Sequence, residues 1–113
     1  MNQPKGKTIN SEALTETQHL LSVLAEECGE IGQRVTKALR FGLREIQPGQ
    51  DMTNETRITL ELCDLWGTIE LLQERGILSA FPVRYLIDRK KEKVATFMSY
   101  ANQIGMIRGN HDD

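Results

Sequence analysis

Two clusters of acidic residues lie inside stretches whose other residues have the spacing of amphipathic helices. The clusters are "AEECGEIGQ", residues 25–33, and "LELCDLWG", residues 60–67. Positions three or four apart share one face of a helix, so Glu27 pairs with Glu30 and Glu61 pairs with Asp64. Four carboxylates that converge repel one another unless a cation binds between them. Oxygen ligands of this kind suit Mg²⁺ or Mn²⁺, and we therefore expect a metal site.

Other interpretations of the same carboxylates remain open. Glutamate is common on solvated helix surfaces, and one such pair alone would indicate nothing. Arg34 follows Glu30 by one turn and Arg57 precedes Glu61 by one turn, so the acids could instead form a salt-bridged seam. The sequence has no His or Cys pair at the spacing of zinc ligands, which argues against zinc.

Three long helices are expected to position these residues, and the fold class is all-α. Apolar residues recur at three- and four-residue intervals over residues 14–38, 58–72 and 83–104, and no stretch alternates as a strand does. Ser11 or Thr15 is expected to cap the first helix, and Thr53 or Asn54 the second. The first helix should end at Gly42, and the stretch 43–53, with Pro48 and Gly49, should form a loop.

The expected architecture is an antiparallel helical bundle in which a second subunit covers the remaining apolar surface. The predicted domain spans residues 11–105, between polar tails at 1–10 and 106–113. Three helices of this length leave apolar faces that one short chain covers poorly, so we expect a homodimer or homotetramer. Gly29 and Gly32 inside the first helix suggest that another backbone or a ligand comes close. Trp66 lies on the apolar stripe of the second helix and is expected to pack in the core.

Composition narrows the class of protein. The chain has 113 residues and a formal net charge of −2, without the basic excess of a general nucleic-acid binder. Its first residues form no apolar run and no segment is long and apolar enough to cross a membrane, so a cytoplasmic protein is expected. Cys28 and Cys63 are expected to be reduced and mostly buried thiols.

The two motifs together resemble the MazG-type all-α nucleoside triphosphate pyrophosphohydrolases. The hallmark of that family is EExxE followed downstream by ExxD, and this sequence has Glu26-Glu27-Cys28-Gly29-Glu30 and then Glu61-Leu62-Cys63-Asp64. The resemblance covers about residues 19–104. The gap between the motifs, residues 31–60, is longer than is usual in the family, and the loop at 43–53 absorbs the excess.

The resemblance implies a metal site and a reaction. Glu27, Glu30, Glu61 and Asp64 would hold Mg²⁺, with Mn²⁺ possible, and Glu26 would have a supporting or water-positioning role. The substrate would be a ribo- or deoxyribonucleoside triphosphate, hydrolysed to the monophosphate and pyrophosphate in nucleotide-pool cleaning. Water would attack the α-phosphorus while the metal neutralised the developing charge.

A polyphosphate substrate also needs cations and polar groups from the protein. The candidate substrate-binding residues are Arg34, Lys37, Arg57, Lys90, Lys93, His19 and Asn54. Lys90 stands on the apolar face of the third helix, where an ammonium group either extends to solvent or meets an anion. Asn54 suits a helix cap better than a base contact.

Two further functions remain open at this point. One is a non-catalytic helical interaction module whose acidic seam is neutralised by arginines. The other is a hydrolase of the same fold that acts on a different pyrophosphate-containing nucleotide.

Overall fold

The described part of the chain, residues 8–109 of a computed structural model, consists of three helices joined by loops. The helices are α1 (Glu16–Phe41), α2 (Asn54–Glu74) and α3 (Arg84–Gln103). No strand occurs among these residues, which confirms the expected all-α class. Parts of both predicted tails, residues 1–7 and 110–113, lie outside the described range.

Local capping explains where the first two helices begin. Thr15 is the N-cap of α1, and its side chain and that of Gln18 form a reciprocal capping box. Thr53, whose side chain accepts a hydrogen bond from the Thr56 backbone, is the N-cap of α2. Gly42 ends α1 with a φ of 100°, a conformation that a residue with a Cβ adopts only with strain.

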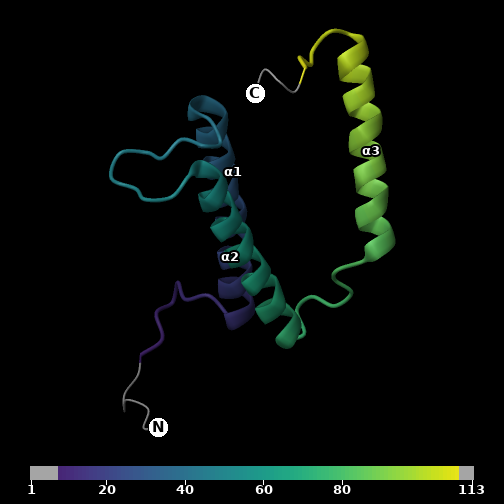
Figure 1. Cartoon of the computed structure of the whole chain (residues 1–113). Helices are drawn as coiled ribbons and strands as arrows, with labels where there is room; N and C mark the ends of the chain where they lie inside the picture. The colour runs from purple at the N-terminus through teal and green to yellow at the C-terminus, as the bar shows by residue number, and fades with distance from the viewer. Residues whose placement is uncertain (1–7, 110–113) are drawn as a thin grey trace. The chain divides into compact units, whose positions relative to one another are not determined.

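Helices α1 and α2 form an antiparallel hairpin (Figure 1). An ion pair between Arg75 and Glu16 joins the end of α2 to the start of α1. Ala38 near one end of the hairpin and Leu72 near the other are the buried hydrophobic residues of the described chain. This small core helps to hold together the two helices that contain the acidic residues.

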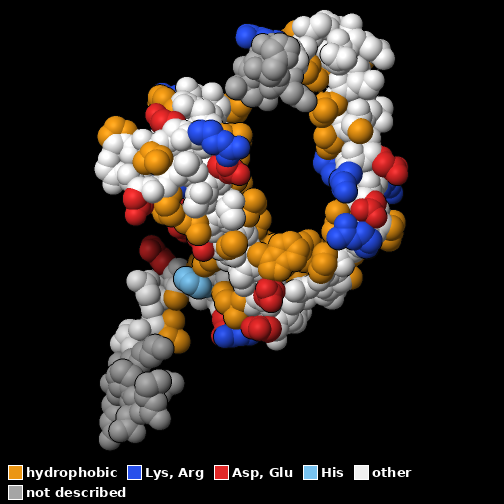
Figure 2. Space-filling view, viewed as in Figure 1, with side chains coloured by type: hydrophobic (Ala, Val, Ile, Leu, Met, Phe, Trp, Pro, Cys, Tyr) orange, Lys and Arg blue, Asp and Glu red, His pale blue; other side chains and the backbone are white. Residues whose placement is uncertain are grey.

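Much apolar surface of the hairpin is exposed to solvent in the single chain. Leu21 is 43% exposed, and Leu62 and Trp66 are each 48% exposed, so the expectation that Trp66 packs in the core is not met in the described structure. Cys28 and Cys63 are free, as expected, but both are exposed, and the prediction of mostly buried thiols is wrong for the single chain. Figure 2 shows such hydrophobic side chains at the molecular surface.

The chain divides into two compact units, with the boundary between Ser79 and Ala80. The first unit contains the α1–α2 hairpin and the second contains α3. The single domain over residues 11–105 and the joining of all three helices in one bundle therefore stay predictions. Within the first unit, a Cβ added at Gly29 or Gly32 would meet no atom within 4 Å beyond its own helix, so the backbone of α2 does not approach them closely.

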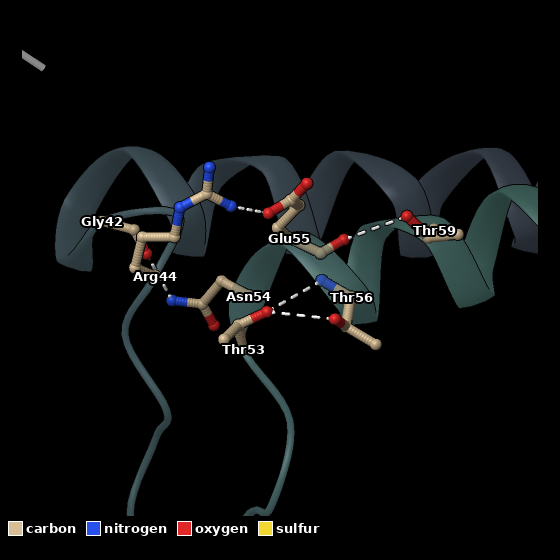
Figure 3. Close-up of polar contacts among 7 residues, drawn as sticks. All are labelled: Gly42, Arg44, Thr53, Asn54, Glu55, Thr56 and Thr59. Carbon is tan, nitrogen blue, oxygen red and sulfur yellow. Dashed lines mark hydrogen bonds and ion pairs between the residues drawn. The ribbon is translucent and has the colours of Figure 1, made fainter.

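The connection between α1 and α2 is held in place by Asn54, which is 2% exposed. Its side-chain amide donates hydrogen bonds to the Gly42 carbonyl at 2.8 Å and to Glu45 Oε1 at 3.1 Å. Its backbone N–H donates to the Glu45 carbonyl at 3.0 Å, and the Glu55 N–H donates to the Leu43 carbonyl at 3.0 Å. Figure 3 shows Asn54 pointing toward Gly42 beside the Thr53 cap. The loop therefore satisfies backbone donors at the start of α2 that would otherwise lack partners.

Replacing this buried amide should destabilise the hairpin. Asn54→Ala removes both part-buried side-chain hydrogen bonds, to the Gly42 carbonyl and to Glu45, so we expect a loss of about 1–3 kcal/mol in the free energy of unfolding. Urea denaturation followed by circular dichroism measures it. Asn10→Ala, which removes only an exposed local hydrogen bond from the Glu12 N–H that water can replace, should shift stability by less than about 0.5 kcal/mol. Equal effects of the two changes would contradict the anchoring role of Asn54.

Candidate metal centre

Three of the predicted carboxylates converge across the α1–α2 hairpin. One carboxylate oxygen from each of Glu27, Glu61 and Asp64 lies within 4.8 Å of the corresponding oxygens of the other two. Glu27 comes from α1, and the other two come from adjacent turns of α2. Glu27 and Glu61 are half-buried and Asp64 is exposed, so the group is open to solvent on one side. Packing of two helices thus brings together side chains that the sequence places more than thirty residues apart.

Glu27 has the most unusual environment of the three. Its Oε2 atom is buried and has no hydrogen-bond partner among the described residues. Desolvation raises the pKa of the Glu27 carboxyl, and the negative charges of Asp64, Glu61, Glu30 and Glu26 raise it further, in that order. An unsatisfied carboxylate oxygen beside two other carboxylates is the arrangement that a divalent cation relieves.

The other two glutamates of the first motif take different positions. Glu30 is half-buried but is not part of the group whose oxygens meet within 4.8 Å. Its charge still raises the pKa of Glu27, so it lies close enough to act on the site. Glu26 is exposed and its charge has the smallest effect on the Glu27 pKa, in agreement with a position beside the site. Its supporting role stays a prediction.

Arg34 is the cation that contacts the group directly. Its Nε atom lies 3.8 Å from Glu61 Oε1, and the two side chains are 24% and 16% exposed. This separation is at the long end for an ion pair, so the contact partly neutralises Glu61 without a close hydrogen bond. Asp64 and Glu27 form no ion pair among the described residues.

Arg57, the other arginine of the predicted seam, does not pair with an acid. Its Nη1 atom donates a hydrogen bond of 3.0 Å to Oε1 of Gln47 in the loop, and both residues are half-buried. Nothing in the sequence pattern around Gln47 marks it as a functional residue. The Pro48-Gly49 pair that follows Gln47 predicts a turn, and such a turn returns the chain toward α2.

The remaining predicted substrate contacts are spread over the chain. Lys37 is half-buried and lines a shallow surface groove on α1 with Gly32 and Arg40. His19 is exposed near the start of α1. The side-chain amide of Asn54 donates its hydrogen bonds to Gly42 and Glu45. Lys90 and Lys93 are exposed on α3, in the second unit, and their part in a site on the hairpin stays a prediction.

Comparisons with known proteins found no matching family model, no matching curated protein and no matching solved structure. Within residues 8–109, no helix is long and apolar enough to span a membrane.

The raised pKa of Glu27 should make stability depend on pH. A carboxyl whose pKa is higher in the folded chain than in the unfolded chain binds more protons when folded, between those two pKa values. Stability should therefore fall as pH rises through that interval when no divalent cation is present. Glu27→Gln should flatten this dependence and raise the melting temperature at neutral pH, because it removes one of the repelling charges.

Thermal melting at a series of pH values in a metal-chelating buffer measures this effect. Glu26→Gln is the matched control, since it removes a neighbouring exposed glutamate and should change the profile only slightly. A wild-type melting temperature that rose with pH over the same interval would contradict the environment assigned to Glu27.

Proposed function

We propose that this chain is a metal-dependent pyrophosphohydrolase that converts a nucleoside triphosphate and water to the monophosphate and pyrophosphate. The observation that carries the proposal is the convergence of Glu27, Glu61 and Asp64 within 4.8 Å. The buried oxygen of Glu27 without a partner supports it further. The EExxE and ExxD motifs supply these residues, and their resemblance to the MazG-type family supplies the reaction.

The donor set fits Mg²⁺ or Mn²⁺. Glu27, Glu61 and Asp64 offer only oxygen ligands, and a site open on one side leaves room for water and phosphate oxygens. Glu30 is the fourth proposed ligand and acts on the site through its charge. When bound, the cation would stabilise negative charge on the phosphoryl oxygens.

The side chains of the hairpin can perform two further tasks. A carboxylate of the cluster beside the cation would accept the proton that the attacking water gives up. The water oxygen would bond to the α-phosphorus as the bond to the bridging oxygen of the pyrophosphate leaving group breaks. Arg34, held beside Glu61, would turn toward the triphosphate when a cation takes its place at that carboxylate.

One observation favours the second candidate, a non-catalytic interaction module with a neutralised acidic seam. The ion pair between Arg34 and Glu61 is half of the pairing that this function predicts. The other half is not observed, because Arg57 contacts the neutral Gln47. The unpaired carboxylates of Glu27 and Asp64 favour the metal site over the seam.

We also propose that the chain works as a homodimer or homotetramer. The exposed Leu21, Leu62 and Trp66 on the hairpin support this, since a second copy would remove this apolar area from water. Sedimentation velocity of the purified chain tests it, and a monomer at micromolar concentration would contradict it.

The experiment that tests the reaction is a panel of ribo- and deoxyribonucleoside triphosphates incubated with Mg²⁺, with the products separated by chromatography. We expect pyrophosphate and the monophosphate from one or a few nucleotides. Glu61→Gln should reduce turnover at least a hundredfold, because it removes a ligand of the cation that offsets charge in the transition state. It should also lower the stabilisation by metal, which for an intact site is about 2.7 kcal/mol at a hundred times the dissociation constant.

Glu70→Gln is the matched control, since Glu70 is an exposed glutamate of the same helix outside the cluster. It should retain both turnover and metal stabilisation. Release of orthophosphate and a diphosphate would contradict attack at the α-phosphorus. Stabilisation by metal without turnover of any nucleotide would direct the search to another pyrophosphate-containing substrate, and the absence of both would favour the interaction module.

A further inference from the structure

Arg57 differs from the ion-paired arginines of the described chain in the chemical group that accepts its hydrogen bond. Several other arginines pair with carboxylates, as Arg34 does with Glu61 and Arg44 with Glu55. Arg57 instead donates to the neutral amide oxygen of Gln47 at 3.0 Å, and no described carboxylate lies within ion-pair distance of it. Its guanidinium group is therefore oriented while its charge is left unneutralised.

The loop that carries Gln47 is fixed at several points. The N–H of Gln50 donates to the Gln47 carbonyl at 3.0 Å across Pro48 and Gly49, and Gly49 has a φ of 81°. This is the backbone of a tight turn with Pro and Gly at its centre. The bonds of Asn54 to Gly42 and Glu45 tie the preceding part of the loop to α2. Gln47 thus approaches Arg57 from a constrained loop.

Arg57 also stands close to the carboxylate cluster along the helix. It precedes Glu61 by four residues, which places the two on one face of α2 and about 6 Å apart along its axis. A polyphosphate chain whose one end lies at the cluster has the length to reach this distance. Arginine suits phosphate oxygens because its planar group can donate more than one hydrogen bond to them.

We propose that Gln47 is a positioning residue that holds Arg57 ready to bind the polyphosphate of the substrate. The neutral acceptor uses one donor of the guanidinium and leaves the others, and the full positive charge, for phosphate oxygens. A carboxylate at position 47 would orient Arg57 equally well and cancel its charge. This inference rests on the proposed function for the identity of the substrate, but the binding of a polyphosphate can be measured without any reaction.

Gln47→Glu tests the proposal because it keeps the size of the side chain and changes only its charge. The affinity for inorganic tripolyphosphate, measured by calorimetry in the presence of Mg²⁺, should fall about tenfold, the effect of weakening one hydrogen bond between charged groups. With an active nucleotide the KM should rise by a similar factor while kcat changes little, since the contact is to the ground state and transition state alike. Gln47→Ala should give a smaller loss, because Arg57 keeps its charge and loses its orientation.

Gln50→Glu is the matched control, because it introduces the same charge at an exposed position of the same loop. It should leave the tripolyphosphate affinity within about twofold of the wild type, since exposed charges act weakly over distance. Equal losses in Gln47→Glu and Gln50→Glu would mean a general charge effect and would overturn the proposal. So would an unchanged affinity in Gln47→Glu with the melting temperature preserved.

The failure of this inference can be told apart from the failure of the proposed function. Hydrolysis of nucleotides with an unchanged KM in Gln47→Glu would remove the role of Gln47 and keep the reaction. A loss of tripolyphosphate binding in Gln47→Glu, in a protein that hydrolyses no nucleotide, would keep the role of Gln47 and remove the reaction.

Discussion

Repulsion among Glu27, Glu61 and Asp64 is the constraint on which the arrangement of the hairpin depends. Packing of α1 against α2 forces one oxygen of each carboxylate to within 4.8 Å of the others, and burial raises the proton affinity of Glu27. Arg34 offsets only part of this charge, through a contact of 3.8 Å with Glu61. The hairpin therefore holds like charges close together, and carboxylates in such an environment are common at binding and catalytic sites.

The rigidity needed to maintain this arrangement comes largely from the ends of the hairpin. Only Ala38 and Leu72 are buried hydrophobic residues in the described chain, so a large core is not what fixes the helix register. Asn54 ties the connecting loop to the start of α2, and Arg75 pairs with Glu16 at the other end. The exposed apolar surface between these ends is the reason to expect that a second copy adds to the stability of the assembly.

Local patterns predict much of the fold and of the site. Helical periodicity and capping residues predict three helices, and Thr15 and Thr53 are the N-caps of the first two. The i and i+3 spacing within each motif predicts that Glu61 lies near Asp64 and that Glu27 lies near Glu30. The helix prediction succeeds because it depends on local geometry, which a short stretch of sequence determines, whereas Glu30 lies outside the group of oxygens that meet within 4.8 Å.

Other features depend on the tertiary arrangement and were not predictable in the same way. Periodicity assigned Cys28, Cys63 and Trp66 to apolar faces, but whether an apolar face is covered depends on which element packs against it, and in the described chain these residues are exposed. The contact of Gln47 with Arg57 spans a loop whose path is set by one turn and by the buried Asn54. A polar residue in a loop gives no sign in the sequence of the partner that it will meet.

The most direct test of the central claim is a titration of the protein with Mn²⁺, followed by the electron paramagnetic resonance signal of the free ion. The account predicts saturable binding in the wild type that Asp64→Asn weakens at least tenfold, because one of three converging carboxylates loses its charge. Mn²⁺ that stayed free in the presence of wild-type protein, or binding that Asp64→Asn left unchanged, would contradict the assignment of these carboxylates to a metal site.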